Sequence, residues 1–364
     1  MSVNEIIVYI MTAFMVLGAL DRIFGGRFGL SAQFEEGIQA MGSLALAMIG
    51  IICLAPVLAN VLRPVLGPVF RVFGADPAMF AGSILACDMG GAPLAKELAE
   101  TSEAGLFSGI IVGSMLGPTI VFTIPVALGI IRDEDRPFLA KGVLAGVVTV
   151  PIGCFVGGLV AGFPLMMTIR NLIPIVIFAL LIALGLWKFE RGMIRGFSVF
   201  GHIVLIVITV GLAAGIVEKL TGLTAIPGMA PLSEGVQVVG DIAIVLAGAF
   251  PLVYAITKIF RKPLMKLGGL LGMNDAAAAG MVATLANNIP MFGMMKDMDR
   301  RGKLLNVAFA VSGSFVFGDH LGFTAGFAPE LLTPMIVGKL VGGVTAVALA
   351  MLFFGRESDD SSKE

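Results

Sequence analysis

Charged residues are scarce in this sequence. Lys, Arg, Asp and Glu together make up 13% of the 364 residues, whereas hydrophobic residues make up 57%. A soluble domain is usually about a quarter charged. Apolar runs long enough to span a bilayer, which takes roughly 20 residues, recur along the whole chain and leave no stretch for a separate soluble domain. The composition therefore predicts an all-α integral membrane protein in contact with membrane lipid.

Cysteine and histidine are also rare. Cys53, Cys87 and Cys154 lie far apart without CxxC spacing, and the chain has only two histidines. This pattern predicts neither a zinc site nor a disulfide framework. Because no motif indicates a metal, a cofactor or a catalytic residue, we expect a protein that is not an enzyme. The net charge of -1 argues against nucleic acid as a partner.

The features of a cleavable signal peptide are scarce as well, and we expect none. The first apolar run, residues 6–20, follows Glu5 rather than a basic segment, and no small-residue cleavage site precedes Asp21. A signal peptide needs both features. We therefore expect this run to be the first transmembrane helix.

The chain contains an internal repeat. EGIQAMG at 36–42 matches EGVQVVG at 234–240, an offset of 198 residues, and LACD at 85–88 matches LANN at 285–288, an offset of 200. The first helix also has a counterpart, because Thr12 matches Thr209 at an offset of 197. Internal repeats of this kind are typical of secondary transporters.

Each repeat is predicted to hold four transmembrane helices and one re-entrant hairpin whose helix is broken by glycine or proline. The repeats cover 1–163, with a hairpin at 76–103, and 198–355, with a hairpin at 274–302. One further helix within 164–197 joins them, and 356–364 form a short cytoplasmic tail. The helix after each hairpin is expected to run unbroken, through 105–131 and 303–327. A single joining helix makes the repeats inverted, with about nine crossings and about eleven hydrophobic segments, hairpins included.

The basic residues orient this arrangement. Of the Lys and Arg residues, 18 lie in stretches assigned to the cytoplasm, and the stretches assigned to the outside hold only Arg63, Arg71, Lys96 and Arg170. The positive-inside rule then predicts an outside N-terminus and a cytoplasmic C-terminus. The bias would weaken if the hairpins crossed the membrane.

Polar residues interrupt both hairpins. Asp88 lies in CDMGG at 87–91, and Asn287 and Asn288 begin NNIP at 287–290. Polar side chains in an apolar setting are costly unless they are paired or functional. We interpret them as substrate-binding candidates, Asp88 for an ammonium group and the asparagines for a hydroxyl. The alternative is that they cap backbone groups freed by the helix breaks.

A second polar motif, FGDHLGF at 317–323, contains Asp319 and His320 and aligns with GPTIVF at 117–122, which contains Thr119. Asp319 is a candidate substrate ligand, and His320 is a group that can take up a proton near neutral pH. Thr119 is a weaker candidate. The alternative is a buried, hydrogen-bonded pair that fixes helix packing.

Three weaker candidates complete the predicted site. Lys339 lies in the middle of the last helix, too deep to snorkel to the interface, so we expect a carboxylate partner such as Asp319. It also has the charge to occupy the site when substrate is absent. Gln39 and Gln237 begin the second helix of each repeat and are candidates for interfacial caps or gate contacts.

Together these segments resemble the ethanolamine utilisation permease family over essentially the whole chain. The resemblance rests on QFEEG (33–37), LACDMGG (85–91), GSMLGPTIVF (113–122), AAGMVATLANNIPMFGMMK (278–296), FGDHLGF (317–323) and PMIVGKL (334–340).

The resemblance implies a multi-pass protein of the bacterial inner membrane that takes up ethanolamine for catabolism. Ethanolamine is a cation at neutral pH, so a carboxylate in the site fits it. Alternating access is the expected mechanism. A passive amine channel and a membrane-embedded transferase or sensor for amino alcohols are the alternatives, and the association of copies of the chain is left open.

Overall fold

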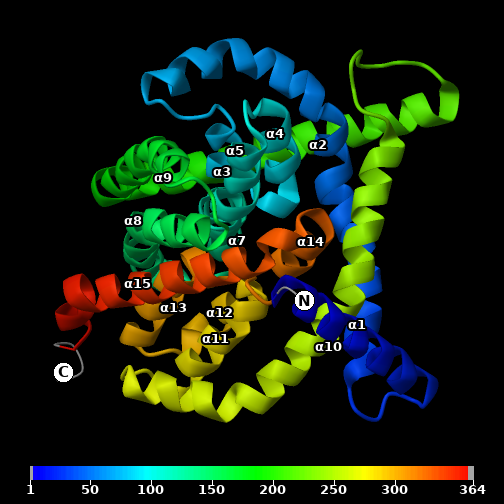
Figure 1. The fold of residues 1–364 in the computed structure, drawn as a ribbon. Helices are drawn as coiled ribbons and strands as arrows, with labels where there is room; N and C mark the ends of the chain where they lie inside the picture. Colours follow the sequence, from blue (N-terminus) through cyan, green and yellow to red (C-terminus); the bar gives the residue numbers. More distant parts are fainter. Residues whose placement is uncertain (1–2, 360–364) are drawn as a thin grey trace.

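The computed structural model describes residues 3–359, except for the side chains at 190, 260, 261, 264, 267 and 355–359. All regular elements in this part of the chain are helical (Figure 1). Within residues 3–359, seven helices are long and apolar enough to cross a membrane, or eight if one bent pair forms a single span. The expected all-α multi-pass membrane protein is therefore confirmed, whereas the number of nine crossings stays a prediction.

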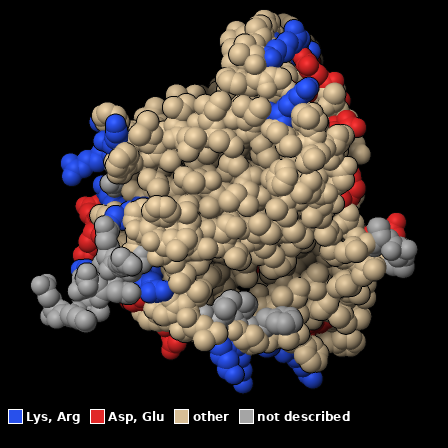
Figure 2. Space-filling model, turned by 60° about the vertical axis from the view of Figure 1, so that its left-hand side comes forward, with Lys and Arg blue, Asp and Glu red and all other residues tan. Residues whose placement is uncertain are grey.

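The candidate spans come from both halves of the chain. They are α1 (Val3–Ile23), α2 (Leu30–Val72), η5 (Asp133–Asp135) with α8 (Arg136–Val160), the two parts of α9 (Leu165–Thr221), most of α10 (Leu232–Leu270), and η7 (Pro329–Leu331) with α15 (Leu332–Asp359). The two parts of α9 meet at Phe189, whose φ of -136° and ψ of 42° are not helical. Figure 2 shows one face whose centre is almost free of charge, with acidic and basic residues at its margins. Such a face suits contact with lipid.

The end of the chain is only partly described. α15 continues to Asp359, so the first residues of the predicted tail at 356–364 are helical. The remainder of that tail lies outside the described residues.

The two interrupted segments are hairpins whose ends are bonded to each other. The first contains α3 (Met79–Ile84), η1 (Cys87–Met89) and α4 (Gly91–Leu98), and the second contains α11 (Asp275–Ala286), α12 (Asn288–Met294) and η6 (Met295–Asp297). The backbone N–H of Glu100 donates to the Asp76 carboxylate at 2.9 Å, and that of Asn274 donates to the Asp299 carboxylate at 2.9 Å. Each segment therefore returns to the place where it began, as a re-entrant hairpin requires.

The helices after the hairpins are broken, contrary to the prediction of unbroken helices at 105–131 and 303–327. The first is divided into α5 (Ser102–Leu106), η2 (Phe107–Ile111), η3 (Val112–Ser114), α6 (Leu116–Pro118), η4 (Thr119–Thr123) and α7 (Ile124–Ile130). It bends by 43° between Ser114 and Leu116. The second is divided into α13 (Arg300–Gly313) and α14 (Asp319–Phe327). The breaks fall at equivalent points, because Ser114 and Ser314 are separated by the same offset as the two hairpin tips.

Helices of the two halves exchange partners in matching ways. Gly50 of α2 lies against Ile208 and Leu212 of α9, and Gly248 of α10 lies against Met11 and Met15 of α1. Gly50 and Gly248 are equivalent positions of the two repeats, and Met11 and Met15 are equivalent to Ile208 and Leu212. The two contacts are therefore counterparts of each other.

The crossing of α2 and α10 obeys the same offset. Gly37 touches Ala247, and Gly235 approaches Ile49. At the offset that relates EGIQAMG to EGVQVVG, Gly37 is equivalent to Gly235 and Ile49 is equivalent to Ala247, so each contact is the counterpart of the other. Because the numbering rises along one helix while it falls along the other, α2 and α10 run antiparallel.

Glycines also allow α8 and α15 to approach closely. The position of a Cβ on Gly338 would lie 2.9 Å from the Gly153 carbonyl oxygen and 3.2 Å from the Gly157 Cα. Small residues let helix backbones meet in lipid, where no hydrophobic force drives association. α15 is thereby held against α8, and Lys339 on α15 is fully buried.

Candidate functional site

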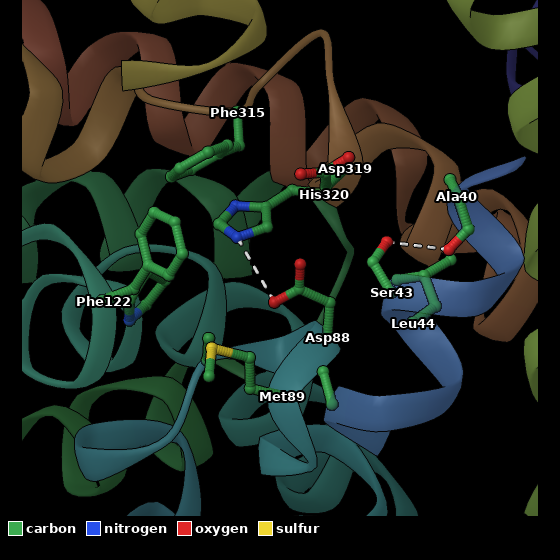
Figure 3. A pocket seen from close by; sticks show the side chains of 12 residues that line it. Ala40, Ser43, Leu44, Asp88, Met89, Phe122, Phe315, Asp319 and His320 are labelled. Carbon is green, nitrogen blue, oxygen red and sulfur yellow. Dashed lines mark hydrogen bonds and ion pairs between the residues drawn. The ribbon is translucent and has the colours of Figure 1, made fainter. Parts of the chain in front are cut away.

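A cavity of about 260 Å³ lies where the tip of the first hairpin meets the start of α14. α2 forms one wall of it, and the broken helix around Pro118 forms another. Its lining residues are Ala40, Ser43, Leu44, Ala47, Ala86, Asp88, Met89, Pro118, Phe122, Phe315, Asp319 and His320 (Figure 3). Two carboxylates and one imidazole thus face a largely apolar chamber.

The tip of the first hairpin presents Asp88 to this cavity. α3 ends at Ile84, the chain is extended at Leu85 and Ala86, and the single 3-10 turn of η1 carries Asp88. Gly90 follows with a φ of 89°, a conformation that glycine adopts without steric cost. Its Cα also packs on Ile51 of α2. The glycine therefore lets the tip lie directly on the cavity wall.

The break between α13 and α14 presents Asp319 and His320. Phe315 has a φ of 61°, which is costly for a side chain of this size. The linker is held by two bonds to the end of α11, from Phe315 N to Thr284 O at 3.1 Å and from Phe317 N to Leu285 O at 2.8 Å. Asp319 then begins α14, where the positive end of the helix dipole favours a carboxylate.

Two aromatic rings close one side of the cavity. Phe315 lies 5.6 Å from Phe122 and 5.1 Å from His320, measured between ring centroids. Figure 3 shows Phe122 and Leu44 on opposite sides of Asp88. Aromatic faces attract cations, so this wall suits an ammonium group as well as an apolar chain.

A chain of polar contacts leads from the cavity into the protein. His320 Nε2 lies 3.7 Å from Asp88 Oδ1, and His320 Nδ1 lies 3.0 Å from Lys339 Nζ. Lys339 Nζ also donates to the backbone carbonyl of Ser114. Lys339 is fully buried behind His320, so the imidazole separates its ammonium from the Asp88 carboxylate.

The broken helix explains why a lysine lies here. In an unbroken helix the residue at 118 would donate its N–H to the Ser114 carbonyl, but Pro118 has no N–H. The Lys339 ammonium supplies the missing donor. A cation at the carboxyl end of a helical segment also meets the negative end of its dipole.

With both carboxyls ionised and Lys339 protonated, the cluster would carry an excess of negative charge. Asp88 and Asp319 are close enough for their charges to interact, and Glu36 on α2 adds a further negative field at Asp319. Lys339 provides one positive charge for the two carboxylates. A monocation in the cavity would balance this excess.

The structure brings three predicted site residues together, namely Asp88, Asp319 and His320, all of which line the cavity. The expected partner of Lys339 was wrong. We predicted a carboxylate such as Asp319, and the ammonium instead contacts His320 and the Ser114 carbonyl, because the Pro118 break leaves that carbonyl free.

Three other predicted residues lie outside the cavity lining. Asn287 accepts a hydrogen bond from Ile289 N at 2.8 Å, which is the capping alternative considered above. Asn288 is buried and donates to Thr123 Oγ1 at 3.0 Å, and its Oδ1 has no partner among the described residues. The Thr119 hydroxyl donates to Met115 O at 2.9 Å and to Val311 O at 3.3 Å, so it ties the broken helix to α13.

Gln39 and Gln237 are exposed and are also outside the cavity lining. Sequence reasoning missed the lining residues Ser43, Phe122 and Phe315. The repeat offers a signal for Ser43, because its equivalent in the second half is Asp241, but the aromatic residues have no polar signal.

Cys87, Asp88 and His320 each have one possible metal-ligand atom, and these three atoms lie within 4.8 Å of one another. The sequence pattern did not predict this trio. A metal ion there would sit beside an imidazole whose other nitrogen already faces the Lys339 ammonium. Because that arrangement puts two cationic centres on one ring, we assign no metal to the cluster.

Comparison with known proteins gives a consistent family. The model of the family described as "Ethanolamine utilisation protein, EutH" matches residues 3–353. A protein of Listeria monocytogenes named "Probable ethanolamine permease EutH" is 66% identical over 356 residues, covering 98% of this chain and 95% of the relative. A protein of the same name in Escherichia coli is 53% identical over 401 residues, covering 100% of this chain and 98% of the relative.

A Bacillus subtilis relative named "Uncharacterized protein YxeR" is 53% identical over 350 residues, covering 96% of this chain and 95% of the relative. No solved structure matches the chain.

Proposed function

Because the chain belongs to the family of the ethanolamine utilisation protein EutH, we propose that it carries ethanolamine across a bacterial inner membrane into the cytoplasm. Close relatives along the full length are named as permeases for this substrate. The candidate membrane spans support a transporter. Ethanolamine supplied in this way would feed a catabolic reaction in the cytoplasm.

The observation that carries the substrate proposal is the pair of carboxylates, Asp88 and Asp319, in one cavity. Protonated ethanolamine is a small cation with a hydroxyl at its other end. Its ammonium would lie against the carboxylates and the rings of Phe122 and Phe315. Its hydroxyl would reach the Ser43 hydroxyl, which is exposed on the α2 wall and donates to Ala40 O at 2.9 Å, leaving its oxygen free to accept.

The matching contacts of the two halves support the inverted repeats proposed from the sequence, over 1–163 and 198–355 with a joining helix in 164–197. An antiparallel crossing of equivalent helices is what a two-fold axis in the membrane plane produces. With this topology the N-terminus lies outside and the stretch at 22–36 is cytoplasmic. The cavity then opens toward the cytoplasm, since the residues of α2 that line it, from Ala40 to Ala47, lie in the half of this helix that follows that stretch.

The same symmetry supports transport by alternating access. In the second half, α14 is closed onto α10, with Gly322 against Leu246 and Gly326 against Ile242. The equivalent pairs in the first half are Phe122 with Met48 and Val126 with Leu44. One member of each of these pairs, Phe122 of the first and Leu44 of the second, lines the open cavity, and the two lie on opposite sides of it. We propose that the halves exchange these two arrangements, which closes the cavity on one side and opens its counterpart on the other.

The test is counterflow of labelled ethanolamine into proteoliposomes loaded with unlabelled ethanolamine, at mildly acidic pH. The purified protein should give saturable counterflow. Asp88→Asn should lower it by at least about tenfold, since a hydrogen bond to a charged group contributes about 1.5–3 kcal/mol. Asp297→Asn, at an exposed carboxylate at the base of the second hairpin, is the matched control and should retain wild-type rates.

Counterflow also distinguishes the carrier from the passive amine channel. A channel would let label equilibrate without transient accumulation and without saturation. Equal rates in folded Asp88→Asn and wild-type protein would remove Asp88 from the site.

A further inference from the structure

The net charge of the buried cluster behind the cavity can be counted from its ionisable groups. The ionisable groups of the cluster are Asp88 and Cys87 of η1, Asp319 and His320 of α14, Lys339 of α15 and Cys154 of α8. Glu36 of α2 is exposed and acts on Asp319 through its charge. The two thiols are free and buried, and they are neutral in an apolar setting. The charge of the buried cluster therefore depends on Asp88, Asp319, His320 and Lys339.

Lys339 faces the Ser114 carbonyl at the negative end of a helical segment, which favours a cation there, so we assign one positive charge to the pair of His320 and Lys339. Their nitrogens are 3.0 Å apart, so one must donate a proton and the other must accept it with a lone pair. If the lysine is an ammonium, His320 Nδ1 is bare and the ring is neutral; if the ring is cationic, the lysine is a neutral amine. In either case the pair contributes a charge of +1, and two ionised carboxylates leave a net charge of -1.

An uncompensated buried charge is costly in a membrane protein, by several kcal/mol. Two ligands remove it equally well. A bound ethanolammonium brings the cluster to neutrality, and so does one proton on Asp88 or Asp319. Both ligands together would leave an excess of +1, so each excludes the other.

We propose that a proton is a second substrate of this site, exchanged one for one against the amine cation. The inference rests on the proposed function. The loaded carrier takes ethanolammonium inward, the cation leaves, a carboxylate takes up a proton from the cytoplasm, and the neutral carrier returns that proton outward. One positive charge moves each way in a cycle, and the net transfer equals that of the neutral amine.

This exchange has a consequence for the cell. An electrogenic uniporter would concentrate ethanolammonium in response to the membrane potential, whereas an exchanger ignores the potential. Uptake by the exchanger follows the gradient of the neutral amine, and the reaction that consumes ethanolamine inside maintains that gradient. The carrier raises the rate under acidic conditions, when the neutral amine that crosses lipid unaided is scarce.

The test measures counterflow first and then net uptake in the same proteoliposomes. A tenfold potassium gradient with valinomycin sets an inside-negative potential of about 59 mV. Exchange predicts that accumulation of label changes by less than about twofold, while a trapped pH dye reports an alkaline lumen as label enters. Uniport predicts about tenfold more accumulation and no alkalinisation. Vesicles with Asp88→Asn correct both readings for unaided permeation of the neutral amine.

Potential-driven accumulation by a protein that shows counterflow would overturn the exchange and leave the carrier intact. Absence of counterflow in folded protein would overturn the carrier, and the exchange with it.

A variant tests the charge count itself. Asp319→Asn makes the empty cluster neutral, so its remaining uptake should respond to the potential and lose the alkalinisation. Asp319→Glu keeps the charge and should keep the exchange. If Asp319→Asn is inactive, uptake by the wild-type protein with and without the membrane potential still distinguishes exchange from uniport. An Asp319→Asn protein that transports without response to the potential would contradict the count.

Discussion

At the scale of single residues, the site depends on backbone groups that a helix would normally use internally. Pro118 withholds a donor from the Ser114 carbonyl, and Lys339 replaces it. Phe315 adopts a φ of 61° in the linker that directs Asp319 and His320 into the cavity. Such departures from regular geometry persist where surrounding structure enforces them, and they concentrate at functional sites.

Gly90 offers a direct test at this scale. Its φ of 89° costs a residue with a Cβ about 1–2 kcal/mol, and an added Cβ would lie 2.7 Å from the Ile51 Cβ, which must then shift. We expect Gly90→Ala to lower the free energy of unfolding by about 2–4 kcal/mol and to reduce uptake. The measurement is thermal unfolding in detergent together with counterflow.

Gly129→Ala is the matched control for this substitution. Gly129 lies inside α7, is exposed, and has open space where its Cβ would go. Alanine there should be neutral or stabilise by up to about 1 kcal/mol. Similar unfolding temperatures for both variants would show that the tip does not require glycine at 90.

At the scale of elements, the two halves of the molecule differ in a way that bears on the transport mechanism. Equivalent sequences form a closed contact between α10 and α14 and an open cavity between α2 and the helix broken at Pro118. Bistable packing of this kind, rather than continuous bending, is how small binding events move whole elements.

Cysteine cross-linking tests the proposed exchange of these arrangements. A Cβ on Gly326 would lie 3.1 Å from the Ile242 Cα, within disulfide reach, so an Ile242→Cys, Gly326→Cys pair should cross-link readily and stop transport until reduced. Leu44→Cys with Val126→Cys should cross-link only as the protein visits the opposite arrangement. The native cysteines are buried, which limits background. Full transport by a completely cross-linked Ile242/Gly326 pair would rule out the exchange.

At the scale of the whole molecule, the repeats should give the hairpins opposite orientations. The base of each hairpin is clamped in the same way, at Asp76 with Glu100 and at Asn274 with Asp299. If the halves are inverted, the first base faces outside and the second faces the cytoplasm.

Labelling of intact cells with a membrane-impermeant maleimide measures this directly. Glu103→Cys, beside the first base, should react from outside, and Asp297→Cys, at the second base, should react only after the cells are permeabilised. Both positions are exposed, so accessibility depends on the side and not on burial. Reaction of both from the same side would show that the halves are parallel.

The sequence by itself determined the solvent, the class and the repeat. Scarcity of charge makes lipid the solvent, and a lipid solvent demands helices that satisfy their own backbone. Motifs that recur at a nearly constant offset located both hairpins. The cost of polar groups in an apolar segment marked Asp88, Asp319 and His320, which line one cavity.

Only the tertiary structure decided which polar residues meet and which merely satisfy local backbone. Asn287 and Asn288 carry the same sequence signal as Asp88, yet one caps α12 and the other bonds Thr123. The breaks at Ser114 and Ser314 escaped prediction because glycine and proline also occur in unbroken transmembrane helices, where neighbours restore the lost hydrogen bonds. Lys339 could be assigned to Ser114 and His320 only once α15 was packed against the broken helix, since the donor and the free carbonyl lie 225 residues apart.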